Sequence, residues 1–423
     1  DAGRCKRRPT GTAQEQVRGK GPSFTIARLS LLRLSSLLLL LLSSASAFSV
    51  GIPPLFGLDK LRFPLAASRA AARGIRSALR MSSDPVATLR AQRPSWQQTM
   101  LRVKDKDASL KFYRDAMGMT LIDILKFPGM GFDLYFLTTL PKDEPYTLTP
   151  GSDEAHQYLW TMKGTTLELT HNYGTESDVD QKYHPGNGEG DGFGHVAFNC
   201  EDVYDACEKL EKAGYRFKKR PDEGRMKGLA FVYDPDMYWV EIVMRGADTG
   251  VKNKFNLSQT MLRIKDPKKS IPFYKAMGMS LLSERHFPEA KFSLYFMQGL
   301  PEGVSPPSDP AGDSGKAFVK GLFNPVLELT HNHGTETDEA FSYKSGNEPD
   351  AKGFGHIGFV VDDVFETCRA MEELGAKYKK EPMGGSMKGL AFMQDPDGYW
   401  IEIIKRGGYD DKATPYWLEE KKD

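Results

Sequence analysis

Apolar and polar residues alternate over several short segments after residue 97, and this pattern predicts a domain of strands and helices. Gln98–Lys104 has the alternation of a half-buried strand. Ala108–Met117 has the spacing of an amphipathic helix, and Gly118 closes it. Three further strands are expected over residues 120–126, 133–137 and 165–170. This gives the order βαβββ.

The same order of elements follows once more before residue 245. After a polar, Gly-rich loop we predict a strand over Gly194–Asn199 and a helix over Val203–Ala213, which ends at Gly214. Short strands are expected near residues 215–217, 229–232 and 238–244. The domain is therefore predicted to contain two βαβββ modules.

Long stretches of this domain recur later in the chain, which indicates a duplication. QQTMLRVKDKDASLKFYRDAMGMTLI (97–122) returns as SQTMLRIKDPKKSIPFYKAMGMSLL (258–282). LELTHNYGTE, GFGHVAF and MKGLAFVYDPDMYWVEIV return in the same order as LELTHNHGTE, GFGHIGF and MKGLAFMQDPDGYWIEII. We therefore predict an α+β fold of four βαβββ modules in tandem domains, 93–248 and 256–406, with a linker at 249–255 and a tail at 407–423.

The first 92 residues differ from the rest in composition and resemble targeting sequence. They contain 15 Lys and Arg against 4 Asp and Glu. The stretch 31–48 has nearby arginines, a leucine run and Ala45-Ser46-Ala47, which is the layout of a signal peptide. An Arg-rich, Ser/Ala-rich and acid-poor segment follows, as in a transit peptide. We read 1–92 as a bipartite leader, removed or disordered, that directs the protein to a plastid; secretion, a cytoplasmic location and an uncleaved anchor are the alternatives.

The remainder carries 42 basic against 52 acidic residues, and this excess of acid argues against nucleic-acid binding. No other segment has the roughly 20 consecutive apolar residues that a helix needs to span a bilayer, so no membrane association is expected once the leader is removed.

Cys200, Cys207 and Cys368 have no CxxC spacing, which indicates reduced structural thiols.

Acidic residues inside otherwise apolar strands are the strongest sign of chemistry. Alternation places Gln98, Met100 and Arg102 on one face of the first strand, Glu168 and Thr170 on one face of another, and Trp239 with Glu241 on one face of the last. A buried, unpaired carboxylate costs several kcal/mol. An internal ion pair could offset that cost, but neither strand offers a Lys or Arg. A divalent metal held by Gln, Glu, His and Glu fits better, with water completing an open, catalytic coordination shell.

The other histidines are interpreted as structural or as surface residues. His171 points away from Glu168 by alternation. His156, His184, His286 and His333 fall in loops or have no equivalent in the other copy. The glycines of GFGH and MKGLAF are interpreted as turns or close backbone approaches.

Taken in order and twice over, QTMLR, LELTHN-x-GTE, GFGH, MKGLAF and DPD-x-YW-x-E resemble the glyoxalase I (lactoylglutathione lyase) family of the vicinal oxygen chelate superfamily. The resemblance covers nearly all of residues 93–406. It implies tandem glyoxalase-type domains whose curved mixed sheets surround metal sites. It also implies sites shared between domains, each combining the front half of one domain with the back half of the other.

The resemblance assigns two sets of metal ligands, all of them intact. Site one would consist of Gln98, Glu168, His356 and Glu402. Site two would consist of Gln259, Glu328, His195 and Glu241. A monomer with an internal pseudo-dimer is expected, because the fused domains already form the shared interface.

The implied reaction isomerises the hemithioacetal of methylglyoxal and glutathione to S-lactoylglutathione. A metal would polarise the vicinal oxygens and stabilise an enediolate, while a ligating glutamate moves a proton between neighbouring carbons. Glu402 and Glu241 are the principal candidate bases, and Glu168 and Glu328 are their counterparts.

Glutathione is the implied cosubstrate, and cations should bind its carboxylates. Candidate substrate-binding residues are Arg102, Asn172, Lys352, Lys380 and Met387 for site one, and Arg263, Asn332, Lys219, Arg225 and Met226 for site two. Asp191 stands where the second copy has Lys352, and a carboxylate there would repel an anion. Site one is therefore predicted to be the better catalyst.

Metal identity and rival functions follow less directly from the residues. The long loops between Glu168 and His195 and between Glu328 and His356 resemble the zinc-dependent branch, with nickel as the alternative. Another metalloenzyme of the superfamily, an epimerase or dioxygenase, is a rival, although an iron dioxygenase would show two histidines per site. A non-catalytic binding module would not need eight intact ligands.

Overall fold

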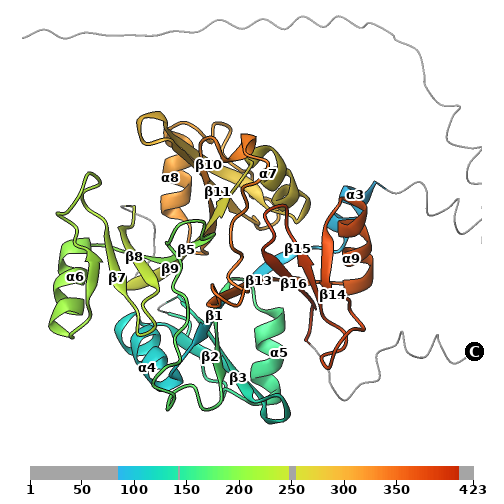
Figure 1. Ribbon diagram of the computed structural model, residues 1–423, viewed down its shortest axis with the longest axis horizontal. Coiled ribbons are helices and arrows are strands. Elements are labelled where there is room, and N and C mark those ends of the chain that lie inside the picture. The colour runs from blue at the N-terminus through green and yellow to red at the C-terminus, as the bar shows by residue number, and fades with distance from the viewer. Residues whose placement is uncertain (1–83, 142, 247–253, 409–423) are drawn as a thin grey trace, which may run out of the picture. The chain divides into compact units, whose positions relative to one another are not determined.

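The computed structural model describes residues 84–141, 143–246 and 254–408 (Figure 1). The predicted leader up to residue 83, most of the linker and the tail from residue 409 lie outside these residues. None of the helices in the described ranges is long and apolar enough to cross a membrane.

The folded body begins earlier than the sequence pattern suggested. Asp84 caps helix α3 (Pro85–Ala91) by accepting a hydrogen bond from the Val86 amide. Leu89 is buried in the main core, and the Gln92 carbonyl accepts from the Asp362 amide. Assigning residues 84–92 to the leader was therefore wrong. The helix is only two turns long, which is too short for periodicity to mark it.

The first domain follows the predicted order with small changes of boundary. Its first module contains β1 (Ser95–Val103), α4 (Lys106–Leu110), β2 (Thr120–Phe127), β3 (Phe132–Thr138), α5 (Asp153–Thr161) and β4 (Thr166–Asn172). Its second contains β5 (Phe193–Cys200), α6 (Val203–Lys212), β6 (Phe217–Lys219), β7 (Ala230–Tyr233) and β8 (Trp239–Met244).

The second domain repeats these elements. Its first module contains β9 (Phe255–Ile264), α7 (Pro267–Ala276), β10 (Ser280–Phe287), β11 (Phe292–Gln298), α8 (Asp313–Gly321) and β12 (Val326–Asn332). Its second contains β13 (Phe354–Val361), α9 (Val364–Glu373), β14 (Lys377–Lys380), β15 (Ala391–Gln394) and β16 (Trp400–Lys405).

Two local features were not predicted from the pattern. The helix expected over 108–117 is an α-helix only to Leu110 and continues as a π-helix over Lys111–Ala116. The second feature is a pair of helices, α5 and α8, which precede the strands that carry Glu168 and Glu328 and are absent from the predicted order βαβββ. Three-residue 3₁₀ turns lie at Pro128–Met130, Pro288–Ala290 and Thr335–Thr337.

Each eight-stranded mixed sheet takes four strands from each domain. One sheet has the order β14-β15-β16-β13-β1-β4-β3-β2, and the other β10-β11-β12-β9-β5-β8-β7-β6. β1 pairs antiparallel with β13 and parallel with β4, and β9 pairs in the same way with β5 and β12. The front module of one domain thus continues into the back module of the other, as the resemblance implied.

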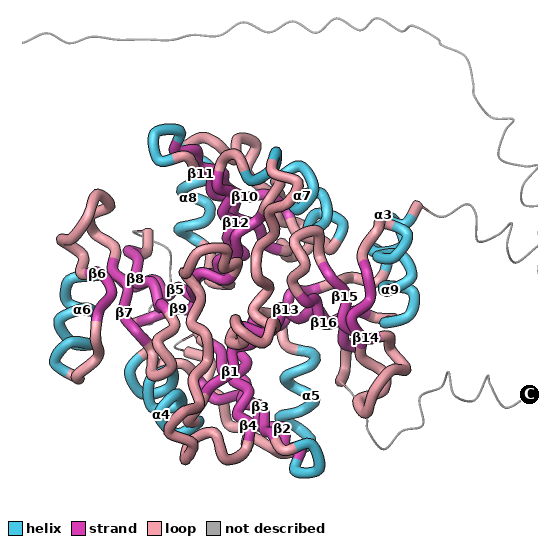
Figure 2. Tube along the Cα trace, in the orientation of Figure 1, coloured by secondary structure: helices cyan, strands magenta, loops and turns pink. Residues whose placement is uncertain are grey.

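The domains share one core, and the helices cover the strands from outside (Figure 2). Helices α5 and α8 contact β2 and β10, and α3 packs against α9. Phe193 and Phe354 of the two GFGH motifs stack with ring centroids 5.0 Å apart. Thr99 and Thr260 share a hydrogen bond of 2.8 Å between their hydroxyls. Equivalent residues of the two domains therefore contact each other at the interface between the domains.

The thiols of the described body are structural, as predicted. Cys200, Cys207 and Cys368 are free and buried. Burial raises the pKa of Cys200 and Cys368 to about 12 and that of Cys207 to about 11. Such thiols stay protonated and unreactive at neutral pH.

Candidate active site

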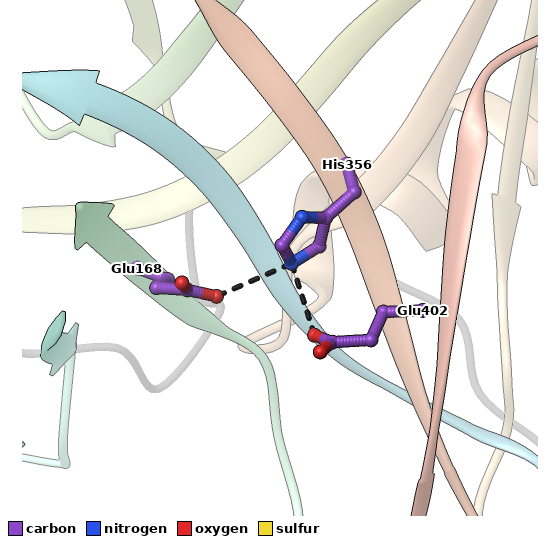
Figure 3. A group of neighbouring side chains, drawn as sticks. All are labelled: Glu168, His356 and Glu402. Atoms are coloured by element: carbon purple, nitrogen blue, oxygen red, sulfur yellow. Dashed lines mark ion pairs between the residues drawn. The ribbon is translucent and has the colours of Figure 1, made fainter. Parts of the chain in front are cut away.

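Site one is assembled from both domains. Gln98 lies on β1 and Glu168 on β4, whereas His356 and Glu402 come from β13 and β16. Figure 3 shows the Glu168 and Glu402 carboxylates converging on the His356 ring from different strands. The structure therefore brings together residues up to 304 positions apart in the sequence, Gln98 and Glu402.

The four polar ends surround one point. His356 Nε2 lies 3.0 Å from the Glu402 carboxylate and 3.3 Å from that of Glu168. The Gln98 amide nitrogen lies 2.5 Å from Glu168, 2.8 Å from Glu402 and 3.2 Å from His356 Nε2. Each side chain is buried.

Strand register explains this convergence. Gln98, Gly358 and Glu402 are partners across β1, β13 and β16. His356, Met100 and Glu168 form the neighbouring row across β13, β1 and β4. A Cβ at Gly358 would lie 2.7 Å from Gln98 Cγ, so the glycine gives Gln98 the room to reach Glu402.

The turn before β16 is fixed by the DPD motif. Asp395 is buried and accepts hydrogen bonds from the Tyr274 hydroxyl and from the amides of Asp397 and Tyr399. The Tyr399 hydroxyl donates to the Arg263 carbonyl in the other sheet. These bonds hold the start of the strand that carries Glu402.

Site two has the same arrangement. Gln259 donates to Glu241 at 2.8 Å and to Glu328 at 2.6 Å. His195 Nε2 lies 3.4 Å from Glu241 and 4.0 Å from Glu328. All eight predicted ligand side chains thus gather in two clusters of four, with the pairing between domains that the resemblance implied.

Burial disturbs the charges in both clusters. It raises the pKa of Glu328 to about 7, and it also raises the pKa of Glu168. Burial disfavours the imidazolium form of His356, but Glu402 and Glu168 outweigh it and raise the pKa to about 9. Within the described chain, Glu168 and Glu402 form ion pairs with His356 alone. In site one, an ion pair with Lys or Arg is therefore not what offsets the buried charge.

The residues of site one fit a divalent cation. Glu168, His356 and Glu402 offer ligand atoms that all lie within 4.8 Å of one another, and so do His195, Glu241 and Glu328. The Gln98 Oε1 atom is buried and has no hydrogen-bond partner among the described residues. Because an amide can turn about its last bond, Oε1 could serve as the fourth ligand. An imidazole, two carboxylates and an amide oxygen suit a borderline divalent metal.

Outside the two clusters, histidines make local contacts. His171 is buried and pairs with Glu176 at 2.9 Å, so its structural interpretation is confirmed. His156 bonds to Asp123 and His184 to Asp191. The Asp191 carboxylate also accepts a hydrogen bond from the Gly188 amide, so both of these partners come from its own loop.

The predicted arginines are positioned by the opposite domain. Arg102 donates to the Gly353 and Phe354 carbonyls and to the Asn347 side chain at 2.9 Å. Arg263 makes the matching bonds to the Asp191 and Phe193 carbonyls and to Asn187.

The predicted asparagines are also held. Asn172 donates to the Tyr183 hydroxyl and Asn332 to that of Tyr343. Asn187 and Asn347 were missed in the sequence. Their signal was a matched Gly-Asn pair before each GFGH motif.

The remaining predicted substrate-binding residues lie on loops. The amines of Lys219 and Lys380 donate to the Leu229 and Leu390 carbonyls. Lys352 and Arg225 are exposed. The structure does not place these four at the cavity walls described next.

A cavity opens beside each cluster. Cavity one, of about 520 Å³, reaches Gln98 and Glu402 and is also lined by Met387. Cavity two, of about 390 Å³, reaches all four residues of site two and is lined by Met226, Arg263 and Asn332. Each cluster is therefore accessible to a small molecule.

Residues 96–242 and 256–403 each match the model of the Glyoxalase/Bleomycin resistance protein/Dioxygenase superfamily. The chain belongs to this family. The α+β fold with tandem domains of this type, predicted from the sequence, is confirmed.

Curated relatives carry the name that the motifs suggested. The chain is 40% identical over 312 residues to a lactoylglutathione lyase of Schizosaccharomyces pombe, which covers 73% of this chain and 95% of the relative. It is 38% identical to glyoxalase I of Saccharomyces cerevisiae, over 82% of this chain and 98% of the relative. A probable chloroplastic lactoylglutathione lyase of Arabidopsis thaliana is 30% identical, over 70% of this chain and 69% of the relative.

A solved structure has the same fold. Glyoxalase I from Zea mays superposes with a TM-score of 0.51 at 26% identity, covering 74% of this chain and 92% of that chain. The resemblance to glyoxalase I is thus supported by both sequence and fold.

Proposed function

We propose that the chain is a lactoylglutathione lyase that converts the hemithioacetal of methylglyoxal and glutathione to S-lactoylglutathione. The observation that carries the proposal is the convergence of eight buried residues into two clusters of Gln, Glu, His and Glu. Full-length relatives named lactoylglutathione lyase and glyoxalase I add to it.

The reaction moves one proton between adjacent carbons, and the glutamates are the groups that can carry it. In site one, Glu402 takes the proton from the carbon bonded to sulfur and returns it to the neighbouring carbon; Glu168 faces it across the cluster. Glu241 and Glu328 have these roles in site two. Burial raises the pKa of Glu168 and of Glu328, which makes these two carboxylates stronger bases than they would be in water.

A bound divalent metal would polarise the two substrate oxygens and favour the enediolate. Gln98, Glu168, His356 and Glu402 would hold it in site one, and Gln259, Glu328, His195 and Glu241 in site two. We propose zinc, with nickel as the alternative, because the long loops before the GFGH motifs resemble the zinc-dependent branch.

Glutathione binding uses the cationic and amide groups beside each cluster. Arg263 and Asn332 line cavity two, and Arg102 and Asn172 are their matched residues for site one. We assign these pairs to the γ-glutamyl end. Lys352, Lys380 and Met387 of site one, and Lys219, Arg225 and Met226 of site two, are assigned to the glycyl end and the surrounding loop.

The rival functions fit less well. An iron dioxygenase would need two histidines and one carboxylate in each site, whereas each cluster here has one histidine and two carboxylates. An epimerase of the family is the closer rival. A binding module without chemistry would not need two buried carboxylates in each site, which are costly to bury.

We propose that the mature protein works in a plastid as a monomer with two sites. The bipartite composition of residues 1–92 and the chloroplastic designation of the Arabidopsis relative support the location. The shared core of the two domains already provides the interface that each site requires.

Formation of a thioester tests the function directly. Purified protein loaded with zinc should convert the preformed methylglyoxal–glutathione hemithioacetal, with a rise in thioester absorbance. Chelator-treated protein should be inactive, and activity should return with zinc or nickel. Metal-loaded protein that produces no thioester would refute the proposal.

A further inference from the structure

The two cavities differ at matched positions on the strand at the sheet edge. Leu125 on β2 lines cavity one, and its counterpart on β10 in cavity two is Arg285. The match is secure because the two strands have the same length and the same antiparallel partners, Leu134 and Leu294. An apolar side chain in one site is therefore replaced by a cation in the other.

The helix beside each cavity changes in the same direction. Trp160 on α5 lines cavity one and packs against Phe136 with ring centroids 5.6 Å apart. The matched residue on α8 is Lys320, which is exposed at the wall of cavity two. A second apolar residue is thus exchanged for a cation.

A third exchange lies on the central strands. Val360 of β13 is buried in the apolar cluster that contains Trp160. Its counterpart Asn199 on β5 lines cavity two, and the Asn199 Oδ1 atom finds no hydrogen-bond partner in the part of the chain that the structure describes. Ser258, also at this wall, has an unpartnered buried hydroxyl. Cavity two is therefore more cationic than cavity one, whose wall has Lys126 together with the acidic Asp153 and Glu402.

Arg285 is a half-buried cation at the wall of cavity two. Its guanidinium packs against the Phe296 ring, 4.9 Å from the centroid. Its Nε atom is buried without a hydrogen-bond partner, and within the described ranges the side chain forms no salt bridge. A half-buried guanidinium without a carboxylate partner is costly, and a bidentate carboxylate would offset that cost.

Two simpler roles for Arg285 explain less. It could balance the charge of Glu328, but a divalent metal would do so at both sites, and site one has no such arginine. It could bind glutathione, but Arg263 and Asn332 already line cavity two for the γ-glutamyl end, and the counterpart of Arg285 in site one, Leu125, does not bind a carboxylate. The difference between the sites must concern the part of the substrate that varies.

We propose that site two acts on hemithioacetals of 2-oxoaldehydes bearing a carboxylate, whereas site one acts on those with apolar substituents. This inference rests on the proposed function. Arg285, Leu294 and Thr330 are partners across β10, β11 and β12, the strand that carries Glu328. Arg285 thus lies two strands, about 10 Å, from that strand. A substituent of the reacting carbons can span this gap toward the long arginine side chain.

The test compares two substrates of similar shape in proteins with one working site. Glu168→Gln with Glu402→Gln leaves site two, and Glu328→Gln with Glu241→Gln leaves site one. The substrates are hemithioacetals of phenylglyoxal and 4-carboxyphenylglyoxal, formed with excess glutathione. The ratio of kcat/KM for the carboxylated over the plain substrate should be about 10-fold higher at site two, in line with a charge-assisted hydrogen bond. Arg285→Leu should remove this advantage, and Leu125→Arg should confer it on site one.

Binding of unreactive mimics gives a readout that does not depend on turnover. The Kd of S-(4-carboxybenzyl)glutathione relative to S-benzylglutathione, measured by calorimetry on the same single-site proteins, should show the same preference. Equal ratios at both sites, or a ratio at site two that Arg285→Leu leaves unchanged, would overturn the inference. Selective binding without thioester formation would support the pocket assignment and refute the lyase proposal. Turnover with equal ratios at both sites would support the lyase proposal and refute the pocket assignment.

Discussion

Replacing both principal bases, Glu241→Gln with Glu402→Gln, should lower kcat/KM for the methylglyoxal hemithioacetal at least about 1,000-fold. Each carboxylate is both a candidate base and a ligand, and general-base catalysis alone contributes about 10²–10⁴-fold. Glutamine keeps the shape of the side chain but cannot accept the proton. Steady-state kinetics at saturating metal measures the effect.

The single variants should divide the activity unequally. Glu402→Gln should remove more than half of the methylglyoxal activity and Glu241→Gln less than half, because Lys352 is the proposed partner of the glycyl carboxylate at site one. Its counterpart Asp191 is bonded to His184 and the Gly188 amide and offers no cation. Glu208→Gln with Glu372→Gln makes the same chemical change on the exposed faces of α6 and α9 and should have no effect. Equal activity from the two isolated sites would contradict the predicted asymmetry.

Much of the fold and both clusters could be predicted from the sequence. Each module has apolar patterns of strand period, and the duplication shows the pattern twice, so errors in one copy are corrected by the other. Glu168 and Glu402 stood out because a charge in an apolar strand needs a partner. Their strand parity also agreed with their convergence in the structure.

What the pattern could not supply depends on contacts between distant segments. That Glu168 meets His356 and not His195 came from the resemblance, because no local signal specifies which half pairs with which. Asn187 and Asn347 acquire their role only when the opposite domain brings an arginine to them. Helix α3 was missed because its stability comes from packing of Leu89 and not from its own length.

Stripping the metal from both sites should lower the melting temperature by about 15–30 °C. Without a cation each site keeps two buried carboxylates and an imidazole in mutual contact. A ligand present at 1,000 times its Kd stabilises the folded state by about 4 kcal/mol per site, and each kcal/mol corresponds to about 2–4 °C in a protein of this size. Thermal denaturation before and after chelation, and after zinc or nickel is restored, measures the shift.

A variant without the carboxylates is the control for this effect. With Glu168, Glu241, Glu328 and Glu402 all changed to Gln, neither cluster retains an acidic ligand, and chelation should leave the melting temperature unchanged. A wild-type protein whose melting temperature does not respond to chelator would mean that the clusters do not hold a stabilising metal.

Pairs of substitutions that lie in one site or in two test the sharing of sites between domains most directly. Glu168→Gln with Glu402→Gln affects both domains but only site one, whereas Glu168→Gln with Glu241→Gln affects only the first domain but both sites. The first pair should leave the activity of site two intact, and the second should abolish turnover of the methylglyoxal hemithioacetal. The reverse result, with activity lost in the first pair and retained in the second, would show that each domain builds its own site and would contradict the account.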